Sequence, residues 1–159
     1  MIILAIDQAS KTAYSVLSVE EGIPNVGDFG TIDYSSIKDA DVRINKLKHK
    51  VSELVNTYKP DIVYIEDIQL EHGNVKVYKF LAKLQGAFID YFIDNNIKYD
   101  VIVPSSWKSF LGVNIKNKRP QQKAETIEII EHMFGVKVNE DEADSIGISY
   151  YFLKGNKTK

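Results

Sequence analysis

Residues 2–7, Ile2-Ile3-Leu4-Ala5-Ile6-Asp7, are the stretch from which the fold can be worked out. Their near-continuous apolar run is typical of a central strand that is buried on both faces. We expect a strand here and not an export signal, because the run lacks a basic leader, is interrupted by Asp7 and has no small-residue cleavage site after it. The stretch therefore predicts a central strand that ends on an aspartate, followed by a turn over residues 8–11.

Outward from this strand, alternation and turn residues predict four more strands, and apolar spacings of three and four predict helices. Pro60 ends the first helix, and Pro120 suits the first position of a later one. The first three strands are expected to pair antiparallel. The expected order is strands at 2–7, 13–20 and a region ending at 31–34, a helix at 41–58, a strand at 61–66, a helix at 74–94, a strand at 99–103, and helices from 120 and over 141–153.

A strand-helix-strand unit normally crosses over right-handed and makes a parallel pair. This order therefore predicts an α/β fold, with a mixed five-stranded sheet and helices on both faces, in a single domain over residues 1–159. The 44% hydrophobic and 26% charged residues are ordinary globular values. No stretch is apolar enough to span a membrane. Cysteine is absent, which excludes disulfides and cysteine-rich zinc sites and fits a reducing cytoplasm.

Charge is distributed unevenly, although the net charge is only −2. Residues 104–124 carry five cations and no acid, so the remainder of the chain carries −7. A protein that holds metal ions against a phosphate backbone needs both kinds of cluster, whereas chance charge blocks on a solvated surface are the alternative. The cations of this segment are Lys108, Lys116, Lys118, Arg119 and Lys123, and Lys76, Lys79 and Lys83 form a second basic row.

Four acids form the candidate catalytic cluster. Asp7 and Glu66 close the first and fourth strands, which are plausible neighbours in such a sheet, and Asp141 and Asp144 share one helix face because they are three residues apart. Each acid alone could be a turn former or a helix-terminal acid. Together they would repel one another unless divalent cations neutralised them, and oxygen-only ligands favour Mg²⁺ or Mn²⁺. Two such ions, about 3.5–4 Å apart, can activate water against a phosphodiester.

Five segments, in order, resemble the RuvC-type Holliday junction resolvases of the ribonuclease H-like superfamily. The first is Ile3 to Tyr14, in which an aspartate ends a strand before a small-residue turn. The others are Val63-Tyr64-Ile65-Glu66, Leu81-Ala82-Lys83-Leu84-Gln85-Gly86-Ala87, Pro104-Ser105-Ser106-Trp107-Lys108 with Gly112 and Lys123, and Asp141-Glu142-Ala143-Asp144-Ser145-Ile146-Gly147-Ile148. The compact chain is most similar to the versions carried by bacteriophages, which would act in the host cytoplasm.

This resemblance implies a ribonuclease H-like fold and hydrolysis of phosphodiesters at Holliday junctions in recombination, repair or replication. Asp7, Glu66, Asp141 and Asp144 would be the metal-binding catalytic acids, and Lys123 would assist at the phosphate. The helix around Leu81–Phe92 would form a homodimer suited to a two-fold junction. Of the basic residues, the resemblance implies phosphate contacts for Lys123 and Lys108. Together with the two basic rows, the expected DNA-binding residues are Lys76, Lys79, Lys83, Lys108, Lys116, Lys118, Arg119, Lys123 and Gln69.

Gln69 departs from the family pattern, in which an aromatic residue commonly stands three positions after the second-motif glutamate. Losing base stacking worth roughly 1–3 kcal/mol would relax junction preference. We therefore hypothesise action on forks, flaps and displacement loops as well, with Leu70, His72 or Tyr78 as substitutes for the aromatic residue. For Trp107, the sequence favours a packing role over base stacking.

Three alternatives stay open at this point. The first is a YqgF-type RNA-processing nuclease, which would share Asp7 but differ in the closing segment, and RNA is not distinguished from DNA by the sequence. The second is an ATP-binding fragment of the actin-like kinase fold, which chain length and glycine content disfavour. The third is a non-catalytic module that binds branched DNA. A metal titration of activity separates the nucleases from the binding module.

Overall fold

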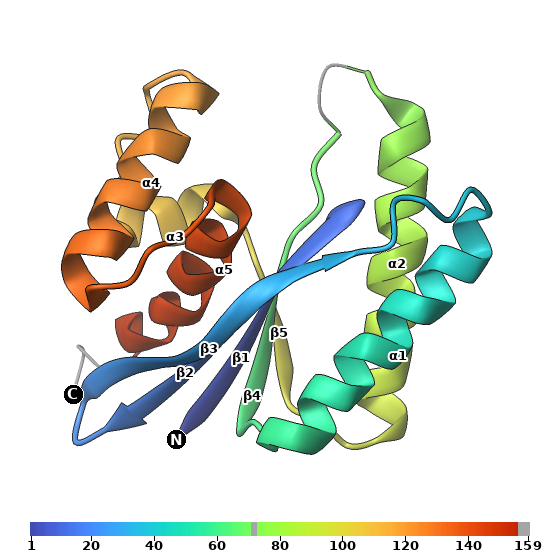
Figure 1. The fold of residues 1–159 in the computed structure, drawn as a ribbon, viewed down its shortest axis with the longest axis horizontal. Coiled ribbons are helices and arrows are strands. Elements are labelled where there is room, and N and C mark those ends of the chain that lie inside the picture. Colours follow the sequence, from blue (N-terminus) through green and yellow to red (C-terminus); the bar gives the residue numbers. More distant parts are fainter. Residues whose placement is uncertain (71–72, 156–159) are drawn as a thin grey trace.

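The computed structural model describes residues 1–70 and 73–155. Strands β1, β2 and β3 come first, followed by helices that alternate with the last two strands (Figure 1). The bounds are β1 Ile2–Asp7, β2 Lys11–Glu20, β3 Ile23–Asp33, α1 Ala40–Tyr58, β4 Ile62–Glu66, α2 Val75–Asp94, β5 Tyr99–Ile102, α3 Pro104–Leu111, α4 Arg119–Phe134, α5 Glu140–Tyr150 and the 3₁₀ helix η1 Tyr151–Lys154.

The five strands form one mixed sheet in the order β3-β2-β1-β4-β5. β1 pairs antiparallel with β2 and parallel with β4, and β4 pairs parallel with β5. The predicted neighbourhood of the first and fourth strands is therefore confirmed. Because β1 and β4 run in the same direction, their carboxyl ends lie at the same edge of the sheet.

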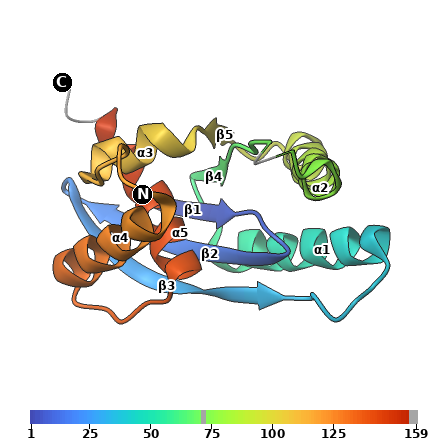
Figure 2. The ribbon, with the colours of Figure 1, turned by 90° about the horizontal axis from the view of Figure 1, so that it is seen from above.

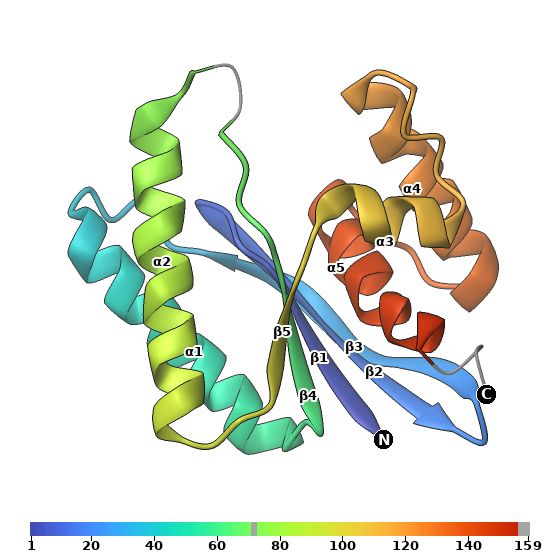
Figure 3. The same cartoon turned by 180° about the vertical axis from the view of Figure 1, so that it is seen from behind.

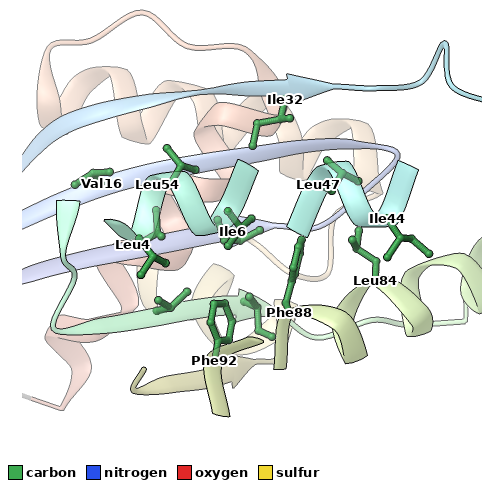
Figure 4. Close-up of a cluster of buried hydrophobic side chains, with 14 residues drawn as sticks. Leu4, Ile6, Val16, Ile32, Ile44, Leu47, Leu54, Leu84, Phe88 and Phe92 are labelled. Atoms are coloured by element: carbon green, nitrogen blue, oxygen red, sulfur yellow. The ribbon is translucent and has the colours of Figure 1, made fainter. Parts of the chain in front are cut away.

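The side chains of β1 alternate between two apolar layers, which explains its near-continuous apolar sequence. Leu4 and Ile6 pack in a core under α1 and α2 that includes Phe88 and Phe92 (Figure 4). Ile3 and Ala5 face the opposite core, beneath α3, α4 and α5 (Figures 1 and 3). The predicted helices on both faces of the sheet are confirmed.

Capping residues fix where several helices begin. The side chain of Asp39 accepts hydrogen bonds from the backbone N–H groups of Asp41 and Val42 at the start of α1, and Asn74 accepts one from Val77 at the start of α2. In α5, Asn139 and Glu142 bond reciprocally to each other's backbone N–H groups as a capping box. Each of these helices begins within one residue of its predicted start.

Two elements differ from the prediction. β3 has 11 residues and begins at Ile23, although four residues that favour turns, Gly22, Pro24, Gly27 and Gly30, punctuate this region, and its pairing with β2 contains a register shift. α3 was not predicted at all, because its eight residues are too short to show a clear helical period. Its sequence signals are Pro104 at the first helical position, a residue that also closes the preceding strand, and Gly112 at the C-terminal cap. Within residues 1–70 and 73–155, no helix has the length and apolar character needed to cross a membrane.

Candidate active site

A cleft of about 680 Å³ opens at the carboxyl ends of β1 and β4, between the first turns of α2 and of α4. Seen from above the strand ends, these two helices stand on opposite sides of them (Figure 2). The cleft is lined by residues from β1, the β4–α2 connection, α2, α3, α4 and α5. All four predicted acids, Asp7, Glu66, Asp141 and Asp144, are among them. The expected convergence of acids that are distant in the chain is therefore found.

The sheet itself brings Asp7 and Glu66 together. Ile6 is in register with Ile65, so each following acid stands at the same edge. The side-chain amide of the buried Gln8 donates to the backbone carbonyl oxygen of Glu66 at 3.0 Å and ties the two strand ends together. The backbone therefore fixes the relative position of Asp7 and Glu66, which suits a site that must hold its ligands in place.

Asp141 and Asp144 are held in the cleft by the packing of α5. The helix lies against β1 and β2, with Ala143 and Ile146 completely buried in the core. The hydroxyl of Ser15 on β2 donates to the backbone carbonyl oxygen of Ser145 at 2.8 Å. This buried hydrogen bond anchors the first half of α5 to the sheet, so the acids before it cannot shift freely along the strand ends.

Burial makes the negative charges of the cluster costly. Desolvation raises the pKa of Asp7 well above its ordinary value, and the charges of Glu66, Asp144 and Asp141 raise it further. Desolvation likewise raises the pKa of Glu66 to about 7, against an opposing hydrogen bond from Trp107, and that of Asp144 to about 6. These carboxylates are therefore poised to bind a cation that would compensate their charge.

Three cations line the same cleft, namely Lys108, Arg119 and Lys123. The ammonium group of Lys123 bonds to the carboxylate of Glu140 at 2.5 Å and is only 22% exposed. Burial opposes its charge, but the bond to Glu140 and the charges of Glu140, Asp144 and Asp141 raise the pKa of Lys123. Lys123 therefore stays protonated beside the acids, where a phosphate oxygen would meet it.

The residues present fit a hard divalent cation. The donor set consists of carboxylate oxygens, and Oδ1 of Asp144 is buried without a hydrogen-bond partner within the protein. Such an orphaned acceptor is costly unless a ligand completes it. In the conformation of this structure, no three histidine or acidic side chains among residues 1–70 and 73–155 are close enough to enclose a metal ion. Closing the ligand set therefore requires side-chain rotation.

Trp107 has a contact that the sequence did not indicate. The predicted packing role is confirmed, because the ring is completely buried. In addition, its indole N–H donates to Oε1 of Glu66 at 2.8 Å. The residue thus joins the core beneath α3 to the acid cluster. No sequence signal could have shown this, because the two residues meet only through the pairing of distant elements.

The remaining predicted DNA-binding residues lie in different places. Gln69 lines the cleft, as does Tyr78, whereas Leu70 is exposed outside its lining. His72 lies outside the described residues. Lys83 pairs with Asp41 of α1 at 3.1 Å. The other lysines of the two basic rows are exposed and not part of the cleft lining, namely Lys76, Lys79, Lys116 and Lys118.

The basic connection between α3 and α4 is held by residues that sequence reasoning missed. The carboxylate of Glu125 accepts from the backbone N–H of Asn114 at 2.8 Å and from the side chain of Asn117. The side-chain amide of Gln122 donates to the backbone carbonyl oxygens of Ile115 and Asn117. These hydrogen bonds from α4 hold the backbone of the connection in place. The lysines of the connection, Lys116 and Lys118, therefore stand on a backbone of defined position.

Comparisons with known proteins agree with this geometry. A curated RuvC crossover junction endodeoxyribonuclease from Citrifermentans bemidjiense is 36% identical over 90 residues, which are 56% of this chain and 54% of that protein. The chain thus spans about half the length of that relative. One from Cytophaga hutchinsonii is 24% identical over 99% of this chain and 80% of its own length.

The fold is shared with T. thermophilus RuvC, solved in complex with a Holliday junction substrate. The TM-score is 0.82 at 16% identity, over 99% of this chain and 97% of that one. This likeness confirms the predicted ribonuclease H-like fold. A family model described as crossover junction endodeoxyribonuclease RuvC matches residues 3–150. The chain therefore belongs to the RuvC family.

Proposed function

We propose that the chain is a metal-dependent endonuclease that hydrolyses phosphodiesters in Holliday junctions and other branched DNA. The observation that carries the proposal is one cleft in which four acids from β1, β4 and α5 face three cations. The acids suit divalent ions, and the cations suit the phosphate backbone on which those ions act. The family match does not favour an RNA-processing or non-catalytic role.

Asp7, Glu66, Asp141 and Asp144 would hold Mg²⁺ or Mn²⁺, two ions in each site. When bound, such ions supply a nucleophilic water and stabilise charge on the attacking and leaving oxygens. The protein's own contribution is to orient the carboxylates from a rigid sheet edge and helix. Lys123, held by Glu140, would meet a phosphate oxygen near the site of cleavage, with Lys108 and Arg119 beside it.

The branched-DNA assignment rests on the family match and on two exposed residues that line the cleft. Gln69 and Tyr78 both line the cleft and are exposed to solvent. Tyr78 would stack on a base, which Gln69 cannot do. Tyr78 would do so from α2, whereas Gln69 lies in the connection between β4 and α2. We therefore infer a substrate range that includes forks, flaps and displacement loops as well as four-way junctions.

A nicking assay on matched four-way, fork and flap substrates tests the function. Wild type is expected to nick all three in Mg²⁺ or Mn²⁺ and none in chelator, while Glu66→Gln nicks none in either condition. Cleavage restricted to one junction sequence would overturn the broad range but keep the nuclease. Metal-independent or absent nicking of every DNA would overturn the function itself.

Lys123→Ala is expected to slow cleavage of a four-way junction about 100-fold, because it removes a fixed positive charge from beside the reacting phosphate. Single-turnover rates at saturating enzyme would measure this effect. Lys137→Ala is the matched control, because Lys137 is 90% exposed and pairs with Glu131 on the surface. If both variants slowed cleavage equally, the lysines would act through general DNA attraction alone.

A homodimer through α2 is part of the proposal. The predicted apolar stripe of this helix is used within the chain, since Leu84, Phe88 and Phe92 are buried in its own core. The outward side carries Gly86, beside which there is open space, and Ile93, which is 61% exposed. Gly86 would let the backbone of a second α2 approach closely, with the exposed Lys83 and Asp90 beside it on the same side of the helix. Sedimentation velocity should give a dimer for wild type and a monomer for Gly86→Arg; monomeric wild type would exclude the dimer.

A further inference from the structure

Trp107 is the only tryptophan of the chain, and its contacts join the elements that build the acid cluster. The ring belongs to the core beneath α3, α4 and α5, and none of its surface is exposed. Its indole N–H donates to Oε1 of Glu66 at 2.8 Å. The acceptor of this buried donor is therefore a proposed metal ligand.

The position of the ring is fixed from the side of α5. A Cβ atom at Gly147 would lie 2.5 Å from Cζ3 and 2.8 Å from Cε3 of Trp107, so the ring occupies the space that a side chain would fill. Gly147 stands three residues after Asp144 on the same helix. Trp107 therefore packs against the helix that carries two of the acids while it bonds to the glutamate at the end of β4.

Lys108 reinforces this arrangement. Its ammonium group lies 5.3 Å from the centre of the Trp107 ring, a cation–π distance, and the residue also lines the cleft. The ring thus holds a cation over its face and a carboxylate at its edge. Both groups face the place where a phosphate and its metal ions would bind.

We infer that Trp107 is a positioning residue for Glu66: its N–H fixes one carboxylate oxygen and leaves the other for a metal ion in the cleft. The inference rests on the proposed function. Ligand-orienting hydrogen bonds of this kind typically change metal affinity or activity about 10- to 100-fold when they are lost. If Trp107 had only a packing role, its ring would fill space in the core, and removing its N–H would change neither metal binding nor cleavage.

The single tryptophan allows the N–H to be removed without changing the shape of the ring. In a tryptophan-requiring host, benzothienylalanine, in which sulfur replaces the N–H, can be incorporated at Trp107 alone, and fluorotryptophan, which keeps the N–H, is the matched control. We expect the benzothienylalanine protein to bind Mg²⁺ about 10-fold more weakly by calorimetry and to cleave a junction more slowly at subsaturating Mg²⁺. Junction affinity and thermal unfolding are expected to match the control.

The fluorotryptophan protein supplies a readout that is independent of cleavage. Its one fluorine NMR resonance should shift with Mg²⁺ at the midpoint measured by calorimetry, and the shift should disappear in Glu66→Gln. Equal Mg²⁺ affinity and equal cleavage in the two labelled proteins would overturn the positioning role alone. A fluorotryptophan protein that neither binds Mg²⁺ nor cleaves would overturn the proposed function, and the positioning role with it.

Discussion

Asp7→Asn is expected to slow cleavage of a four-way junction by about 1,000-fold or more while leaving junction binding intact. The substitution keeps the shape of the side chain but removes a charge and a ligand oxygen at the centre of the cluster, where Glu66, Asp144 and Asp141 all act on Asp7. Metal ions contribute several kcal/mol to such reactions, and each 1.4 kcal/mol is a factor of ten in rate. Single-turnover cleavage measures the loss, and gel shifts in chelator measure binding.

Asp67→Asn provides a matched control for this experiment. Asp67 lines the same cleft one residue after Glu66, and its backbone N–H donates to the carbonyl oxygen of Ile102, but its carboxylate is not among the main influences on the pKa of Asp7. Its cleavage rate should stay within a few-fold of wild type. Comparable losses in both variants, or loss of junction binding by Asp7→Asn, would contradict the role assigned to Asp7.

The sequence predicted the parts of this site that follow from local periodicity and chain direction. The apolar run ending at Asp7 favoured a buried strand over an export signal, and the expected pairing of the first and fourth strands placed Glu66 at the same edge, as the structure shows. The spacing of Asp141 and Asp144 placed both on one side of a helix whose capping box is visible in the sequence. Local rules therefore predicted the sheet, the longer helices and the elements that carry the four acids, while the family resemblance joined these acids into one site.

Features that depend on tertiary packing could not be predicted in this way. The stripe on α2 was expected to be one apolar face, but the helix extends beyond the sheet. Phe88 therefore enters the core while Val77, on the same stripe, is 45% exposed at the cleft. The hydrogen bonds from Trp107 to Glu66 and from the backbone of Asn114 to Glu125 join different elements, and no periodicity or motif in the sequence links them. Such contacts arise only after the elements have packed.

The metal-free protein is expected to lose stability as the pH rises from 5 to 8. The folded-state pKa of Glu66 is about 7 and that of Asp144 about 6, both raised from values near 4 in the unfolded chain. Between the unfolded-state and folded-state pKa values, these two carboxyl groups keep their protons in the folded protein but lose them in the unfolded chain. The free energy of unfolding therefore falls as the pH rises through this range. Glu66 alone accounts for about 2–3 kcal/mol, or roughly 5–10 °C in melting temperature.

Thermal unfolding in chelator at pH 5 and pH 8 tests this dependence, with Glu66→Gln as the informative variant. The amide introduced by this substitution carries no charge, and its oxygen can still accept from Trp107, so the variant should lose less stability and exceed wild type at pH 8. Mg²⁺ should restore the wild type at pH 8, because it binds the deprotonated carboxylates of the folded state. Glu53→Gln, at an exposed position on α1, is the control and should follow wild type. If Glu66→Gln showed the same pH dependence as wild type, burial of Glu66 would not be the source of the instability.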